Sequence, residues 1–385
     1  MCKREKVHFE DFPKTIYINL DIEFRKKFFS DFCNKFNSDK EAALYLFEKA
    51  KKYSRNDFNS LYSQIRQYKT FNTEKFIPIW LILEVAKINK YNLKVIEKNI
   101  GSYNSQRGVV IKDPILPIKV TPEFDSILAH MLGDGTDKRN KSNTGDYCQY
   151  NKISLYNFID KIKKVFGTIE LKVNDKKVNV SSCIILILKK YFNISDFGTF
   201  ASYLPKKLFT HSKYHKLAVI LSFIVDEGTV YDNVSIRMAN KKIINDIRRL
   251  IISCGYSCRQ IRKTPNISGT TCYKVSLLNS DLKCISNDIK KLSHLFPTCT
   301  LVHRQESFNF LANYSRSCAR KRYYGETKRL ILELLNNKKY KTYELAKILN
   351  ISRRTTSIHL DELEKQNKVY LYKVTNMGAK IWSSD

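Results

Sequence analysis

The spacing of apolar residues divides the chain into three regions. From residue 15 to about residue 100, apolar positions recur every three or four residues in FRKKFFSDFCNKF, EAALYLFEKAKKY and FIPIWLILEVAKI, which predicts helices. The polar stretch GSYNSQRG (101–108) and the following KDPILPIKVTPEF are typical of a linker. From there to about residue 318, short helical patterns alternate with strand-like runs such as CIILILKKY and YKVSLL, which predicts an α+β region.

The C-terminal region carries a second kind of pattern. ETKRLILELLNN, TYELAKILN and SRRTTSIHLDELEKQNKV predict three helices, and VYLYKV and AKIWSS predict a closing strand pair. A short turn ends at Ser352, a suitable N-cap for the third helix. This order resembles a winged helix-turn-helix, which places the start of that helix in a DNA major groove. The expected DNA-binding residues there are Arg353, Arg354, Thr355, Thr356 and His359. A winged helix used only for protein contacts is the alternative.

Charge narrows the choice of partner. The chain has 385 residues, of which 43% are hydrophobic, so folded cores are expected and the length suits two or three domains. Lys and Arg outnumber Asp and Glu by 68 to 37, a net charge of +31. Such an excess favours a polyanionic partner, because Lys and Arg on phosphates release condensed counterions. Ribosomal and membrane-surface proteins can be equally basic.

Cysteines and the N-terminus bear on location. The ten cysteines are scattered, and the pair Cys254 and Cys258 follows no usual zinc spacing, so we expect reduced thiols. The N-terminal MCKREKVHFEDF has no apolar signal segment, and no run approaches the length of a membrane span. A soluble, cytoplasmic, nucleoid-associated protein is expected.

A ten-residue stretch occurs twice in the middle region. ILAHMLGDGT (127–136) and ILSFIVDEGT (220–229) align without a gap, share four identical positions, and both end in an acid followed by Gly-Thr. The amphipathic stretches FIDKIKKVFG (158–167) and IINDIRRLIISCG (243–255) follow at corresponding places, each before a strand-like region. A module of roughly 90 residues, the approximate spacing between Asp134 and Glu227, has therefore been duplicated, with a longer insertion after the first acid.

The repeated segment predicts paired chemistry. Each copy is an apolar helix, started in the first copy by Thr121 and Pro122 and stopped after the acid by Gly135 or Gly228. If the two helices pack about a pseudo-twofold axis, Asp134 and Glu227 emerge side by side. Two adjacent carboxylates repel unless a divalent cation lies between them. That arrangement suits metal-assisted phosphodiester hydrolysis.

These two segments resemble the LAGLIDADG helices of homing endonucleases in their single-chain, two-repeat form. The likeness covers about residues 113–318, and YLPKKLFTHSKYHKLAVILSFIVDEGTV (203–230) resembles the approach to that family's second helix. The resemblance implies that Asp134 and Glu227 are the metal-binding catalytic acids, that Mg²⁺ or another divalent cation is the cofactor, and that a monomer cleaves both strands of double-stranded DNA. It also implies two antiparallel sheets in the major groove.

The chain departs from the family pattern in places. Leu132 and Val225 replace the motif's earlier aspartate, and Asp226 stands where the second copy would have a small residue. The family's catalytic lysine cannot be assigned by spacing, and Lys274 is only a weak candidate. His130 is expected to be a packed or surface histidine rather than a ligand.

Basic residues between the core elements are predicted phosphate contacts. They are Lys138, Arg139, Lys141 and Lys172 in the first repeat and Arg237 and Lys263 in the second. In the N-terminal region, SLYSQIRQYKTFNTEKFIPIWLILEVAKIN resembles a degenerate helix-turn-helix with Arg66 and Lys69 on its surface, and a plain helical bundle is the alternative.

The predicted architecture is an α+β fold. A duplicated LAGLIDADG core of the αββαββα type with pseudo-twofold symmetry occupies 113–318, between an all-α N-terminal domain (1–112) and a C-terminal winged helix (319–385). A site-specific double-strand DNA endonuclease is the leading function. A DNA-binding regulator that keeps the fold without cutting, and an RNA-splicing maturase, are the alternatives.

Overall fold

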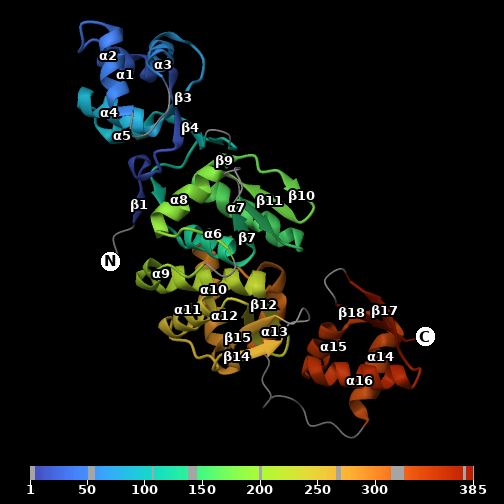
Figure 1. Cartoon of the computed structure of the whole chain (residues 1–385). Coiled ribbons are helices and arrows are strands. Elements are labelled where there is room, and N and C mark those ends of the chain that lie inside the picture. Colours follow the sequence, from blue (N-terminus) through green and yellow to red (C-terminus); the bar gives the residue numbers. More distant parts are fainter. Residues whose placement is uncertain are drawn as a thin grey trace. The chain divides into compact units, whose positions relative to one another are not determined.

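The computed structural model describes residues 5–50, 57–105, 108–137, 145–198, 202–265, 270–313, 325–375 and 379–384. Helices and antiparallel sheets are mixed along the chain, which confirms the α+β class (Figure 1). The chain forms two compact units, Met1–Val219 and Ile220–Asp385. The predicted division into three domains stays a prediction. The cysteines in these ranges are free thiols, as predicted.

The N-terminal helices confirm the apolar periodicity. They are α1 (Ile22–Cys33), α2 (Asp39–Ala50), α3 (Phe58–Thr70), α4 (Ile79–Asn89) and α5 (Leu93–Lys98). Asp21 and Asp57 cap α1 and α3 by accepting backbone N–H groups. The strand β3 (Phe76–Pro78) lies between α3 and α4, so these two helices are not joined by the short turn of a helix-turn-helix.

The prediction of an all-α N-terminal domain was wrong. A five-stranded sheet in the order β3-β2-β4-β5-β9 runs through this region. Its other strands are β2 (Ile16–Leu20), β4 (Ile100–Ser105), β5 (Ile111–Lys112) and β9 (Thr168–Ile169). The predicted linker at 101–108 was also wrong, because Gly101–Ser105 belongs to β4, a central strand with Tyr103 fully buried. Polar side chains predicted a linker, but the backbone groups of this segment pair with β2 on one side and β5 on the other.

Further pairing joins the N-terminal segment to the first repeat. β1 (Lys6–Val7) pairs with β6 (Ile118–Lys119), and β5 pairs with β9, which follows the second helix of that repeat. The 3₁₀ helix η1 (Phe9–Asp11) follows β1. The predicted boundary at residue 112 therefore falls inside a sheet.

The first repeat folds as helix, two strands, helix, two strands, helix. Its elements are α6 (Pro122–Gly133), β7 (Gly135–Asp137), β8 (Gly145–Cys148), α7 (Lys152–Phe166), β10 (Val173–Asn174), β11 (Lys177–Val180) and α8 (Ser182–Phe192). Thr121 caps α6 and Pro122 is its first residue, as predicted. CIILILKKY is helical rather than a strand, because α8 is buried on most sides and its continuous apolar run hides the helical period.

The second repeat has the same order of elements. After the short α9 (Lys206–Thr210) come α10 (Lys213–Glu227), β12 (Gly228–Val230), β13 (Val234–Met238), α11 (Lys241–Ser253), β14 (Arg262–Pro265), β15 (Thr271–Ser276), η2 (Asn279–Asp281) and α12 (Leu282–Leu295). The first sheet runs β7-β8-β11-β10 and the second β12-β13-β15-β14. The duplication seen in ten residues therefore extends to the topology of two sheets.

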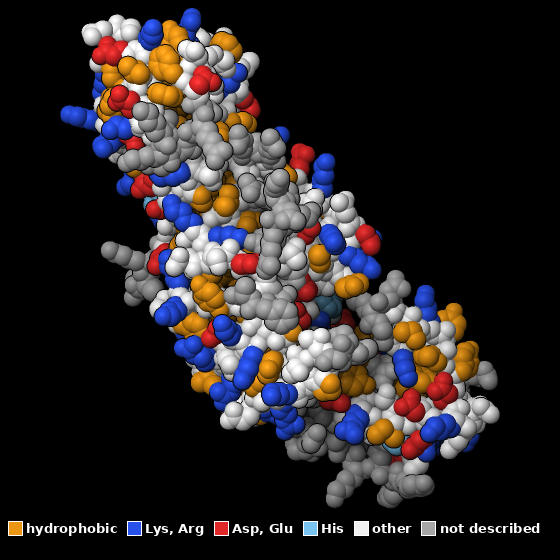
Figure 2. Space-filling view, in the orientation of Figure 1, with side chains coloured by type: hydrophobic (Ala, Val, Ile, Leu, Met, Phe, Trp, Pro, Cys, Tyr) orange, Lys and Arg blue, Asp and Glu red, His pale blue; other side chains and the backbone are white. Residues whose placement is uncertain are grey.

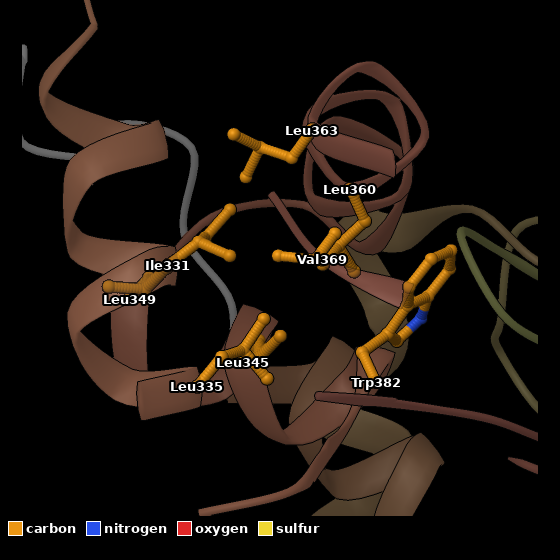
Figure 3. Close-up of a cluster of buried hydrophobic side chains, with 8 residues drawn as sticks. All are labelled: Ile331, Leu335, Leu345, Leu349, Leu360, Leu363, Val369 and Trp382. Atoms are coloured by element: carbon orange, nitrogen blue, oxygen red, sulfur yellow. The ribbon is translucent and has the colours of Figure 1, made fainter. Parts of the chain in front are cut away.

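The C-terminal region has the order of a winged helix-turn-helix. Its elements follow η3 (Val302–Arg304) and α13 (Gln305–Asn313) and are α14 (Glu326–Asn337), β16 (Tyr340–Lys341), α15 (Thr342–Leu349), α16 (Arg353–Lys365), β17 (Tyr370–Val374) and β18 (Lys380–Ser383). β17 and β18 form the predicted hairpin, and β16 adds a third strand. Eight apolar side chains, Trp382 among them, form its core (Figure 3). Within the described ranges, every helix is too short or too polar to cross a bilayer.

Candidate functional site

The two repeated acids lie at equivalent ends of their helices. Asp134 is the C-cap of α6, and its backbone N–H donates to the His130 carbonyl at 3.0 Å. Glu227 is the last residue of α10. Both residues are half-buried, and in both repeats the first strand begins at the next residue. The side chain of Gln149 donates to the Asp134 carboxylate at 3.3 Å.

The glycine after each acid has a role other than the predicted one. Neither Gly135 nor Gly228 is among the residues with positive φ, so they do not end the helices in a left-handed conformation. A Cβ on Gly135 would lie 2.4 Å from the Met131 carbonyl oxygen, and one on Gly228 would lie 2.3 Å from that of Ile224. Glycine is required because the strand leaves by passing against the last helical turn.

The second sheet presents a basic row on one face. Arg237 on β13 pairs with Lys274 on β15, which pairs with Arg262 on β14. Directly paired residues share a face, so the three cationic side chains stand in line across the sheet. The apolar Ile236 and Val275 occupy the other face, and α11 packs against β13 and β15.

The register separates two residues that were predicted together. Lys263 pairs with Tyr273, which pairs in turn with Met238, so Lys263 belongs to the face opposite Arg237. It is exposed, but it cannot share a surface with the basic row. The guanidinium of Arg237 also donates to the Pro265 carbonyl, which orients it toward β14.

Lys177 is a residue that the sequence reasoning missed. It pairs with Cys148 on β8 and with Asn174 on β10, and it holds the position in the first sheet that Lys274 holds in the second. Burial raises the pKa of the Cys148 thiol, with Lys177 opposing the shift and Asp146 and Asp134 adding to it. Lys177 and Asp134 therefore act on the same thiol. Only strand register reveals this equivalence.

The remaining core residues are placed as follows. Lys172 is exposed just before β10. Lys138, Arg139 and Lys141 lie outside the described residues. His130 is packed, as predicted: its Nε2 lies 2.7 Å from the Lys161 ammonium, and burial lowers its pKa well below the usual value, with Lys161 adding to the shift.

Arg353 is not placed as a DNA contact would be. The side chain is 5% exposed, its Nη1 donates to the Val230 carbonyl at 3.3 Å, and its Nη2 donates to Ser307 Oγ at 2.9 Å. The guanidinium also stacks near the rings of Tyr231 and Tyr343, at 5.5 and 5.4 Å. The first residue of α16 thus faces the second repeat, which differs from its predicted place in a DNA major groove.

Only part of the predicted helix start is open to solvent. Thr356 is fully buried and donates to the Ser352 carbonyl at 3.0 Å, which also differs from its predicted place in a DNA major groove. Arg354 and Thr355 are exposed, and His359 is partly exposed, 3.7 Å from Glu362. Ser352 caps α16 through the Thr355 amide, as predicted.

Comparison with known families supports the assignment of this region. Residues 325–370 match the model of the bacterial regulatory protein, arsR family. The match covers α14, α15 and α16, and it supports a DNA-binding helix-turn-helix. It spans well under half of the chain. No curated protein matches the sequence.

Among the solved structures that resemble part of this chain are two of the same protein. A crystal structure of I-DmoI in complex with DNA and Mn is 14% identical, with a TM-score of 0.30, over 42% of this chain and 91% of that chain. A structure of mesophilic variants of the homing endonuclease I-DmoI is 14% identical, with a TM-score of 0.31, over 44% of this chain and 94% of that chain. Likeness at this level carries no argument about function.

Proposed function

We propose that this protein is a site-specific double-strand DNA endonuclease of the LAGLIDADG type, with both repeats in one monomeric chain. The observation that carries the proposal is the doubled unit: an apolar helix ends in an acid, a glycine follows, and a sheet of the same strand order is built after it. A fold kept only for stability has no need of an acid at both helix ends.

Asp134 and Glu227 are the proposed metal-binding acids. Both offer carboxylate oxygens, the hard ligands that Mg²⁺ prefers, and their partial burial favours a cation beside them. A bound Mg²⁺ supplies an activated water and stabilisation of the leaving oxygen. Gln149 orients the Asp134 carboxylate through its 3.3 Å hydrogen bond.

The polar faces of the two sheets are the proposed DNA-binding surfaces. In the second sheet, the row of Arg237, Lys274 and Arg262 would contact backbone phosphates. Lys177 and the exposed Lys172 would contribute in the first sheet. Arg354 and Thr355 at the start of α16 would extend the recognised site.

A DNA-binding regulator with a non-cleaving core is the second candidate. The match of residues 325–370 to a family of bacterial regulatory proteins favours it. In that case the two acids would have no catalytic role, and duplex DNA would be bound without being cut.

Cleavage of a randomised duplex library tests the choice. Wild type with Mg²⁺ is expected to enrich cut ends at one long, asymmetric sequence, and Asp134→Asn or Glu227→Gln is expected to lower the rate at least about 100-fold, a barrier increase of about 2.7 kcal/mol. Asp160→Asn, at an exposed position on α7, is the matched control and should cleave like wild type.

The outcomes separate the candidates. Two results together support the regulator. Wild type binds one DNA sequence specifically, and it produces no cut ends when Mg²⁺ or Mn²⁺ is added. Cleavage that survives both acid substitutions contradicts the assignment of Asp134 and Glu227. Binding is measured without divalent cations, so that loss of DNA affinity is not mistaken for loss of chemistry.

A further inference from the structure

A second cluster of ligand-type side chains lies in the first unit, away from the repeated acids. Asp125 is in the first turn of α6, His211 is the C-cap of α9, and His215 is in the first turn of α10. Asp125 and Asp134 are nine positions apart, so about 13 Å of helix separates them. The cluster is therefore distinct from the proposed nuclease site.

The three side chains converge on one carboxylate oxygen. Nδ1 of His211 lies 2.6 Å from Asp125 Oδ2, and Nδ1 of His215 lies 2.7 Å from the same atom. The two imidazole rings are 5.1 Å apart between centroids, and the three ligand atoms lie within 4.8 Å of one another. Two imidazole nitrogens and one carboxylate oxygen thus face a common point.

Burial makes this arrangement costly without a cation. Asp125 is 0% exposed, and its Oδ1 has no hydrogen-bond partner in the described part of the chain. Among the described residues its ion-pair partners are the two histidines, whose side chains are 10% and 19% exposed. A buried carboxylate is stable only when it is paired or coordinates a metal, and a cation held by the two imidazole nitrogens would place a full positive charge beside Asp125.

We propose that Asp125, His211 and His215 bind a divalent transition-metal ion, with Zn²⁺ as the best-fitting ion. Imidazole nitrogens suit Zn²⁺ far better than Mg²⁺, and three protein ligands with water in the fourth position complete a tetrahedron. A metal ion binds imidazole nitrogens and carboxylate oxygens only in their deprotonated form, so the affinity is expected to fall as the pH falls. The ion links the first turn of α10 to the first turn of α6, and through His211 it also holds the end of α9.

Titration of the full chain, without DNA, tests the proposal. One equivalent of Zn²⁺ is expected to bind the chelator-treated protein by calorimetry and to raise the midpoint of thermal unfolding. Co²⁺ in its place should give visible absorption bands of a tetrahedral site without sulfur ligands. Asp125→Asn and His215→Gln should each weaken binding by more than the about 10- to 100-fold that outer-shell changes cost. His294→Gln, at an exposed histidine outside the cluster, is the control.

Three results would overturn the site. They are failure of wild type to take up stoichiometric Zn²⁺ or Co²⁺, full binding by both cluster variants, and a sulfur-to-cobalt charge-transfer band, which would move the ion to cysteines. Circular dichroism checks that each variant is folded, and the wild-type titration needs no variant. Asp134→Asn is expected to bind Zn²⁺ with wild-type affinity. Zn²⁺ binding at Asp125, His211 and His215 is therefore tested independently of DNA cleavage.

Discussion

At the residue scale, Gly135 and Gly228 hold equivalent positions in the two repeats. Each follows an acid that ends a helix, and each leaves no room for a side chain, because the backbone of the preceding helical turn lies against it. The same constraint in both copies, at aligned positions, shows that duplication preserved backbone geometry as well as sequence. The glycines therefore hold the acids at the helix–strand junction.

Adding one carbon atom at these glycines should destabilise the fold. Gly135→Ala and Gly228→Ala are each expected to lower the free energy of unfolding by about 1–3 kcal/mol, because a Cβ meets backbone atoms that cannot move away cheaply. Urea unfolding followed by circular dichroism measures the change. Gly101→Ala is the control, since the nearest heavy atom to its Cβ would be 4.0 Å away. Equal stabilities for all three variants would contradict the close approach.

At the scale of the element, α16 divides its first turn between two tasks. Arg353 and Thr356 face inward, whereas Arg354 and Thr355 face solvent. The apolar spacing of the helix predicted its existence and its N-cap, but not that its first residue would find acceptors at Val230 and Ser307. Arg353 attaches the helix-turn-helix to the second repeat.

Removing Arg353 should affect stability rather than DNA binding. Arg353→Ala is expected to lower the stability of the C-terminal unit by about 1–3 kcal/mol, because buried acceptors lose their donor. Urea unfolding monitored by Trp382, buried in the core of this region, reports the loss. Unchanged stability together with weaker DNA binding would show that Arg353 turns outward to meet DNA.

Its neighbour should behave in the opposite way. Arg354→Ala is expected to leave stability within about 0.5 kcal/mol, as for most surface substitutions. It should weaken duplex binding and reduce the slope of log affinity against log salt by about 0.9, the loss of one phosphate contact. Fluorescence anisotropy at several salt concentrations measures both. Arg249→Ala, exposed on α11, is the matched control, and an equal effect there would remove α16 from the interface.

At the scale of the whole molecule, charge is the dominant property. The chain has 68 Lys and Arg against 37 Asp and Glu, and Figure 2 shows Lys and Arg spread over the visible face with Asp and Glu among them. Such a surface attracts polyanions in general. Specificity must come from placed residues, such as the row of Arg237, Lys274 and Arg262.

Binding to duplex DNA should accordingly depend steeply on salt. With six or more phosphate contacts, affinity is expected to fall by about 10³ between about 50 and 200 mM salt. Titrations of wild type with a duplex and with a structured RNA of equal length measure the effect and the preference. Tighter binding of the RNA would favour a splicing role, and salt-independent binding would contradict phosphate contact.

The local features of this protein were determined by its sequence alone. The apolar period defines α1 and α14, the caps at Thr121 and Ser352 mark where helices begin, and the repeated decapeptide places an acid at two helix ends. These features depend on residues three or four positions apart, whose interactions survive any tertiary arrangement. The duplication itself needed no structure.

Long-range pairing was decided only by the tertiary structure. Gly101–Ser105 is a central strand because distant strands satisfy its backbone groups, and Lys177 matches Lys274 because of strand register. His211 and His215 meet Asp125 across 86 and 90 residues. The physical reason is common to all three: burial and pairing depend on neighbours brought together by folding, and chain spacing does not record which neighbours those are.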